Sequence, residues 1–302
     1  MKKYITIILF VNIFYNILVA QGTTAGNFLK IPVAANVVSR GDAGVALTGT
    51  SATMLYNPSL LTTVKQKEVC FTHVEYIKSK YETLVYSHPL PQQQTVGVFL
   101  GYFYTEEVLR TIIDKTVEEG YKEIGVYTNN FKTLLLSYAK EVNEKTNFGF
   151  ALRYLQEKLV DWTAEGYSFD IGLAYYIEKN FVLAAAVQNI GSGLKFLSKE
   201  EEMPIVTRIG TEYTTKKFVV NNEIQINNDN TYHIKLGTEI KLADIFYISC
   251  GYNYSETINY LGFLSGLTVG GKLKIVNYAL CYSLGYYSEF GFVHRITFVG
   301  RF

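Results

Sequence analysis

From residue 67 to the C-terminus, the chain consists of segments of about ten residues in which apolar side chains alternate with small or polar ones. In the last segment, Phe298 and Ile296 fall on one face of an extended chain. Arg295 and Arg301 fall on the other face. Alternation over this length indicates half-buried strands, and segments of about ten alternating residues separated by turns are typical of transmembrane barrels. The pattern therefore predicts an all-β fold, a transmembrane antiparallel β-barrel over residues 65–302.

The number of these segments predicts about fourteen strands, and single-chain bacterial barrels have even strand numbers. The predicted strands span 67–79, 80–90, 94–105, 126–141, 146–159, 164–178, 180–190, 203–215, 218–227, 230–242, 245–256, 264–275, 277–287 and 290–302. Short turns fall at one end, expected to be periplasmic, at 143–145, 178–180, 216–217 and 276–277. Longer connections fall at the other end, expected to be extracellular, at 106–125, 191–202 and 257–263. The charged segment 106–125 is expected to be a solvated helix or a long extracellular loop.

A soluble all-β protein, in which the apolar faces would meet in a core, is the alternative to a membrane barrel. The other faces argue against it, because they combine glycine with both signs of charge, as a polar lumen would. The charged residues predicted to face the lumen are Arg153, Asp170, Arg208, Glu212, Lys235, Glu239, Lys272 and Arg295. Opposite charges on neighbouring strands can pair. We interpret this set either as an ion-pair network or as a lumen that attracts a ligand carboxylate.

Composition agrees with strands and excludes one class of partner. The formal net charge is +1, so there is no electrostatic case for nucleic-acid binding, which usually needs a basic patch or stripe. After the N-terminus, no apolar run approaches the roughly 18–20 residues of a spanning helix. The chain has 25 Tyr and 19 Phe but only 5 Pro. This mixture favours strands, since aromatic residues suit a pleated surface and proline interrupts it.

The first twenty residues resemble an export signal. Lys2 and Lys3 precede an almost unbroken apolar stretch that ends at the small residue Ala20. This order of basic, apolar and small residues is typical of a secretory signal peptide. A retained N-terminal membrane anchor is the alternative. We predict a signal peptide at residues 1–20, cleaved after Ala20, and export to the cell outer membrane, where the barrel contacts outer-membrane lipid.

Residues 21–64 differ from the rest of the mature chain because they are small, weakly polar and rich in turn signals. They include Gly41-Asp42-Ala43-Gly44 and the Asn57-Pro58 pair, a turn signal. Residues 28–38 are expected to form a short helix. The segment is too small for a core of its own, so it should pack against or inside something larger.

The sequence contains no pattern that predicts catalysis or a cofactor. The nucleophile-elbow, zinc-protease, phosphate-loop and dinucleotide-binding motifs are all missing. The three cysteines have no metal-ligand spacing, and the four histidines are scattered over different segments. We therefore predict that the protein is not an enzyme and has no cofactor and no metal site.

Several short motifs, in order along the chain, resemble those of the PorV/PorQ family of outer-membrane proteins, distant relatives of the FadL fatty-acid channel. They are Phe28-Leu29-Lys30-Ile31, Gly41-Asp42-Ala43-Gly44-Val45-Ala46, Tyr56-Asn57-Pro58-Ser59-Leu60, Ala186-Val187-Gln188-Asn189-Ile190-Gly191, Met203-Pro204, Arg208-Ile209-Gly210, Leu284-Gly285 and His294-Arg295-Ile296. The resemblance implies a fourteen-stranded barrel whose N-terminal segment, residues 21–64, plugs the lumen. It makes Asn57, Pro58 and Phe28 candidates for a plug or gate, although Asn57-Pro58 could equally be a purely structural turn.

The resemblance leaves two functions open. By analogy with the fatty-acid channel, the protein would bind or pass a hydrophobic small molecule across the outer membrane. By analogy with PorV-like proteins, it would be a partner-binding component of a type IX-like secretion or cell-surface attachment system, with secretion-system proteins as partners. The exposed apolar stretch expected in the loop at Tyr260, Leu261, Phe263 and Leu264 would suit the second function.

Overall fold

The computed structural model describes residues 26–302 except 197, 198 and 257. The predicted signal peptide and residues 21–25 of the predicted plug lie outside the described residues. None of the described helices is long and apolar enough to cross a membrane.

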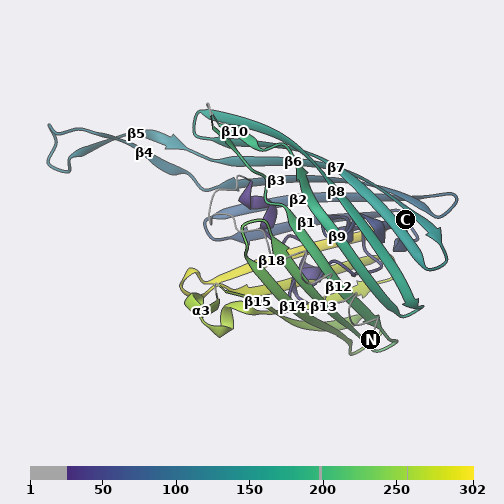
Figure 1. Ribbon diagram of the computed structural model, residues 1–302. Helices are drawn as coiled ribbons and strands as arrows, with labels where there is room; N and C mark the ends of the chain where they lie inside the picture. The colour runs from purple at the N-terminus through teal and green to yellow at the C-terminus, as the bar shows by residue number, and fades with distance from the viewer. Residues whose placement is uncertain (1–25, 197–198, 257) are drawn as a thin grey trace, which may run out of the picture.

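Fourteen antiparallel strands close into a barrel, as the alternation predicted (Figure 1). They are β1 (Glu68–Tyr76), β2 (Ser79–Leu90), β3 (Gln94–Thr105), β6 (Asn130–Asn143), β7 (Thr146–Leu159), β8 (Trp162–Glu178), β9 (Phe181–Gly191), β12 (Val206–Thr214), β13 (Phe218–Asn227), β14 (Tyr232–Lys241), β15 (Phe246–Ser255), β16 (Leu267–Ile275), β17 (Tyr278–Tyr286) and β18 (Phe292–Arg301). Each strand pairs with the next barrel strand along the chain, and β18 pairs with β1.

The C-terminal strand closes the barrel with regular pairing. Glu68 of β1 lies opposite Arg301 of β18, and the register continues to Glu75 opposite His294. The backbone N–H of Phe302 donates to the carbonyl of Lys67 at 2.9 Å. The first and last strands are therefore joined over most of their length, which closes the wall there.

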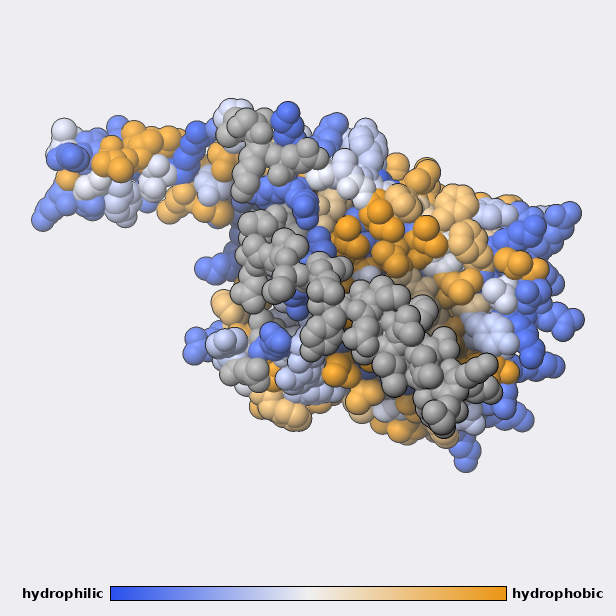
Figure 2. Space-filling view, viewed as in Figure 1, coloured by the Kyte–Doolittle hydropathy of each residue, from blue (hydrophilic) through white to orange (hydrophobic). Residues whose placement is uncertain are grey.

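The outer face of the wall is apolar and the inner face is small or charged. Phe298 and Ile296 are both 46% exposed, whereas Thr297 between them is 1% exposed and Arg295 before them is fully buried. Figure 2 shows apolar side chains over the middle of the visible wall and hydrophilic ones at the end with the short turns. An apolar band of this kind suits lipid, because hydrocarbon offers no hydrogen bonds to polar groups.

The connections differ in length at the two ends of the barrel. The short-turn end carries the connections at 91–93, 144–145, 179–180, 215–217, 242–245 and 276–277. The long-loop end carries the others, including α3 (Ile258–Leu261), η4 (Phe263–Gly266), η5 (Ser288–Phe290), β10 (Leu194–Phe196) and β11 (Lys199–Glu201). The division follows the predicted alternation of short turns and long loops.

Residues 106–125 do not form the helix that was one expectation for them. They contain β4 (Val108–Ile113) and most of β5 (Tyr121–Tyr127), a two-stranded hairpin that projects from the long-loop end (Figure 1). The reason is local. Val108–Ile113 is rich in β-branched residues, which favour a strand over a helix. Gly120 and Gly125 adopt positive φ, which glycine tolerates and which interrupts a helix.

Residues 26–64, here called the N-terminal segment, lie against the inner face of the barrel. They form η1 (Asn27–Lys30), α2 (Ala35–Val38), η2 (Ser51–Leu55) and η3 (Pro58–Thr63). The single helix expected at 28–38 is therefore two short helices, because Ile31–Ala34 between them are not helical.

Lumen-facing glycines let the N-terminal segment approach the wall closely. A Cβ on Gly251 would lie 2.0 Å from the backbone nitrogen of Gly41. A Cβ on Gly149 would lie 2.5 Å from the backbone nitrogen of Ser59. At these glycines the backbone of the N-terminal segment is therefore in direct contact with the backbone of the barrel wall.

Candidate functional site in the lumen

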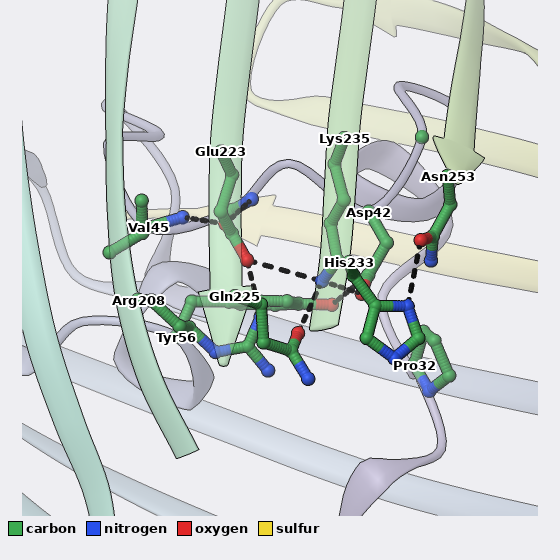
Figure 3. Close-up of polar contacts among 12 residues, drawn as sticks. Pro32, Asp42, Val45, Tyr56, Arg208, Glu223, Gln225, His233, Lys235 and Asn253 are labelled. Carbon is green, nitrogen blue, oxygen red and sulfur yellow. Dashed lines mark hydrogen bonds and ion pairs between the residues drawn. The ribbon is translucent and has the colours of Figure 1, made fainter. Parts of the chain in front are cut away.

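A buried charge cluster joins the N-terminal segment to β12, β13 and β14 (Figure 3). Glu223 of β13 accepts from Arg208 Nη1 at 2.6 Å and from Lys235 Nζ at 3.1 Å. The same carboxylate accepts the backbone N–H groups of Gly44 and Val45, both at 2.8 Å. Charge-assisted bonds from both sides make Glu223 the centre of the cluster.

The N-terminal segment contributes its own carboxylate to this cluster. Lys235 Nζ donates to Asp42 at 2.7 Å, and the Tyr56 hydroxyl donates to Asp42 at 2.6 Å. The Arg208 guanidinium lies 5.2 Å from the centre of the Tyr56 ring. Every charged group of the cluster therefore has an opposite charge within ion-pair distance, as buried charges need.

The sequence pointed to Arg208 and Lys235 but missed Glu223, Asp42 and Tyr56. Alternation in 218–227 would have placed Glu223 on the inner face, beside Asn221 and Gln225. No periodic signal could have found Asp42, because it lies in an irregular turn with φ of 60°.

The other charged residues predicted for the lumen do face it, but they lie apart from one another. Arg153 pairs with Asp170 at 2.8 Å, and both are buried. Lys272 pairs with Glu239 at 2.6 Å. Arg153 and Asp170 lie on the neighbouring strands β7 and β8. Lys272 and Glu239 lie on β16 and β14, so their contact spans the intervening strand β15.

Glu212 has a different role, because hydrogen-bond donors rather than a cation surround its carboxylate. It accepts the backbone N–H of Thr48 at 3.2 Å, the Thr48 hydroxyl and the Asn221 amide at 2.9 Å. Glu68 of β1 similarly accepts the backbone N–H of Ser51 at 2.6 Å. Together with Glu223, these carboxylates hold three separate turns of the N-terminal segment against the wall.

Asn57 fastens the Asn57-Pro58 turn to the wall. Its amide nitrogen donates to the carbonyls of Val45 at 3.0 Å, Leu173 at 3.2 Å and Ala185 at 3.4 Å. Its Oδ1 accepts the backbone N–H of Ser59 at 3.0 Å and so caps η3, in which Pro58 takes the first position. Asn57 and Pro58 are both buried, and the turn joins the N-terminal segment to β8 and β9.

Phe28, the third gate candidate, lies in an apolar cluster nearer the long-loop end. Its ring centre is 4.5 Å from that of Phe131, which in turn is 5.5 Å from Phe103. Leu155 and Leu194 are fully buried against the same group. We call these five residues the aromatic cluster; it is a packed apolar group on the inner side of the wall.

Arg295 is the predicted charge without a carboxylate partner among the described residues. Its Nε donates to the carbonyl of Pro32 at 2.9 Å, but Nη1 and Nη2 are buried and have no hydrogen-bond partner. Ser283, directly opposite on β17, has a buried hydroxyl that also lacks a partner. The set predicted from sequence therefore contains both satisfied and unsatisfied charges.

A cavity of about 310 Å³ lies at the long-loop end, and its lining includes Asp42, His233 and Lys235. Pro32, Tyr76, Gly285 and Tyr287 line it on the side of the arginine. Arg295 Nη1 lies 3.8 Å from the position of a Cβ on Gly285. Arg295 itself is fully buried and is not one of the lining residues.

Solved structures share this architecture, although no protein-family model and no curated protein matches the sequence. The Pseudomonas putida toluene transporter TodX superposes with a TM-score of 0.64 at 14% identity, over 93% of this chain and 98% of TodX. The Ralstonia pickettii toluene transporter TbuX gives 0.60 at 14% identity, over 89% and 98%. A Pseudomonas aeruginosa FadL homologue gives 0.59 at 9% identity, over 90% and 99%. The chain has the fold of the FadL-like channels.

In this FadL-like barrel, two further cavities open at the short-turn end. They measure about 880 and 440 Å³, and both are lined by Thr48, Gly49, Thr63 and Lys65 of the chain that leads into β1. The N-terminal segment thus separates the two cavities at the short-turn end from the cavity at the long-loop end. Among the described residues, no group of three or more His, Cys, Asp or Glu side chains is placed to hold a metal.

Proposed function

We propose that this protein spans the bacterial outer membrane and passes small hydrophobic molecules through its lumen. The observation that carries the proposal is the aromatic cluster, a packed apolar group inside a barrel with the FadL-like fold. The toluene transporters that share the fold support this substrate class. The signal peptide predicted at residues 1–20 and the apolar outer face support the location, with the long-loop end outside and the short-turn end in the periplasm.

In this proposal the N-terminal segment is a plug that must move to let a molecule pass. An apolar molecule entering from outside meets Phe28 first and then the segment held by Glu223, Glu212 and Asn57. Those bonds keep the plug seated, and Asn57-Pro58 and Phe28 form its gate. The order of the short motifs along the chain supports placement with the PorV/PorQ type of FadL-like protein.

Uptake of labelled toluene and a labelled fatty acid, in cells with and without the gene, tests the transport function. Deletion should lower uptake of at least one of them, and the intact gene should restore it. Phe28→Ser should reduce the restored uptake severalfold, because it puts a hydroxyl in the aromatic cluster. Phe71→Ser is the matched control, since Phe71 faces outward and is 47% exposed. Equal uptake with and without the gene would rule out the transport function.

A second function, as a partner-binding component of a type IX-like secretion or surface-attachment system, has an observation of its own. The β4–β5 hairpin projects beyond the barrel, and Leu109, Ile113 and Val126 on one of its faces are more than half exposed. Tyr260 and Phe263 in the β15–β16 loop are exposed as well. Exposed apolar surface of this kind often marks an interaction site.

Purification from the native membrane tests this second function. The intact protein should bring down secretion components or surface cargo, and a variant in which a short turn replaces 108–127 should lose them. Recovery of the intact protein without any such chain would exclude the secretion role. The barrel itself is checked in the same sample, because a folded barrel migrates differently on a gel before and after boiling.

A further inference from the structure

We propose that the smaller of the two cavities at the short-turn end binds a small anion that carries two or more negative charges. This cavity measures about 440 Å³ and lies between the chain that leads into β1 and the barrel wall. The inference goes beyond the proposed passage of hydrophobic molecules, because it concerns a different cavity and a ligand that is charged.

The first step is the net charge of the cavity. Five cationic side chains line it, namely Arg40, Lys65, Lys272, Lys274 and Arg301. Two carboxylates line it, those of Glu212 and Glu239. Glu68, which pairs with Arg301 from outside the lining, raises the carboxylates to three, so five minus three leaves an excess of two positive charges. A concave site with an excess of one sign of charge attracts ions of the opposite sign.

The second step is where this excess lies. Lys272 pairs with Glu239 at 2.6 Å, and Arg301 pairs with Glu68 at 2.8 Å. The other three cations of the lining have no carboxylate within ion-pair distance in the part of the chain that the structure describes. They are Arg40, Lys65 and Lys274. These charges are the ones that a bound anion can neutralise.

The third step is the position of Arg40, the most buried cation of the lining at 5% exposure. Its Nε donates to the backbone carbonyl of Asn36 at 2.9 Å, and its Nη1 donates to the side-chain oxygen of Asn221 at 3.4 Å. Both acceptors are neutral, so they orient the guanidinium without cancelling its charge. A planar, oriented guanidinium is well suited to carboxylate and phosphate oxygens. Arg40 therefore gives the site a fixed anion-binding group.

The fourth step is the class of anion. Arg40 and Lys65 belong to the chain before β1, whereas Lys274 belongs to β16 of the wall. A ligand with a single charged group would neutralise only one side, so a compact anion with two or more groups is favoured. The volume of about 440 Å³ lies within the roughly 300–1,000 Å³ of small-molecule pockets. Such an anion would touch both the N-terminal segment and the wall, and so it would help to hold the segment in place.

Calorimetric titration of the purified full-length barrel, in nanodiscs of zwitterionic lipid, tests the proposal. The probes are citrate, pyrophosphate and trimethyl citrate, a neutral ester with the carbon skeleton of citrate. At least one of the two anions should bind roughly tenfold or more tightly than the ester. The tighter anion identifies carboxylate or phosphate as the preferred group. Its affinity should fall as the salt concentration rises, because salt screens the attraction.

Two variants locate the site. Arg40→Gln should weaken binding of the preferred anion by about tenfold or more, since it removes a charge-assisted contact. Lys274→Gln should weaken binding by about threefold, the effect of one exposed charge. Lys274 is exposed and has no carboxylate partner among the described residues, so its substitution leaves the fold intact. This second variant decides the matter if Arg40→Gln disturbs the N-terminal segment.

The matched control is Lys216→Gln, which removes an exposed positive charge from the turn between β12 and β13 at the same end of the barrel. Lys216 lines neither of the two cavities there, so its substitution should leave the affinity unchanged. Gel migration before and after boiling confirms that each variant is folded. The proposal is overturned if the ester binds as tightly as both anions, if Lys274→Gln leaves the affinity unchanged, or if Lys216→Gln lowers it as much as Lys274→Gln.

Discussion

Arg208 and Arg295 are both buried in the lumen against the N-terminal segment, yet their surroundings differ. Arg208 has Glu223 at 2.6 Å, the Gln188 amide oxygen at 2.8 Å and the face of Tyr56. Arg295 has one backbone carbonyl. Arg208, whose donors have acceptors, helps to hold the N-terminal segment, whereas the two unpartnered nitrogens of Arg295 cost stability. The difference shows which of the two arginines helps to fix the N-terminal segment to the wall.

Removing Glu223, the centre of the buried charge cluster, should give the largest loss of stability. Glu223→Ala leaves Arg208 and Lys235 without their shared carboxylate and two backbone N–H groups without an acceptor. We expect a loss of about 3–5 kcal/mol in the free energy of unfolding, the usual cost of breaking a buried ion pair from one side. Urea titration of the refoldable barrel measures it. Glu165→Ala on the outer face should change stability by less than about 0.5 kcal/mol, and equal losses in the two variants would contradict the role of the cluster.

Asn57→Ala should cost less, because it removes neutral hydrogen bonds. The carbonyls of Leu173 and Ala185 keep their ladder bonds, but η3 loses its cap and the turn loses its attachment to the wall. The expected loss is about 1–3 kcal/mol. Protease cleavage within residues 26–64 should rise in parallel. Asn57→Asp keeps the acceptor for Ser59 but not the donors, so an Asn57→Asp barrel as resistant as the original would show that only the cap matters.

Arg295→Met should change stability in the opposite direction. It replaces an unsatisfied buried cation by an apolar side chain of similar length, so the free energy of unfolding should increase by about 1–3 kcal/mol. Arg208→Met should decrease it, because Glu223 would lose one of its two cations. The pair of variants tests the comparison directly by urea titration. A decrease for Arg295→Met would mean that Arg295 has a partner inside the folded barrel.

The smallest loss of stability should come from breaking the ion pair between Lys30 and Asp229 at the long-loop end. Partial burial raises the pKa of Asp229, but the hydrogen bond from Lys30 and those from Thr231 outweigh it and lower the pKa below its usual value. A lowered pKa means that the contribution is present above the usual aspartate range and is lost as pH falls through the lowered pKa.

Asp229→Asn should therefore destabilise the attachment of η1 by a few tenths of a kcal/mol at neutral pH. The difference from the unchanged protein should disappear in strong acid. Hydrogen exchange of the η1 amides at several pH values measures it. A difference that persists unchanged at pH values below the lowered pKa would assign the effect to something other than the ion pair.

The barrel was predictable from sequence because one physical rule fixes it. A wall between lipid and lumen requires alternation in every strand, so Phe298 and Arg295 had to point to opposite sides, and the ranges of the strands followed. Nothing comparable governs residues 26–64 or 106–125. Short helices packed inside a wall, and a hairpin beyond it, follow local and tertiary contacts that have no period. Of the two alternatives for 106–125, a helix or a long loop, the helix was wrong for that reason.

The candidate site was predictable only in part. Alternation brought Arg208, Lys235 and Arg295 to the lumen, but it could not say which carboxylate would reach which cation. Asp42 reaches Lys235 across 193 positions of sequence because an irregular turn presents it. Which arginine remained unpaired depended on the path of the N-terminal segment, and that path is set by contacts at Gly149, Gly251 and Asn57.

The hairpin described at the long-loop end has a consequence for how a protein partner could be recognised. Every barrel strand has a neighbour on both sides, so the wall offers no backbone groups for an incoming strand. β4 and β5 pair only with each other, so each keeps one row of N–H and C=O groups unpaired. A partner that adds a strand to this protein would therefore do so above the membrane, and its main-chain bonds would make it tolerant of side-chain variation along the added strand.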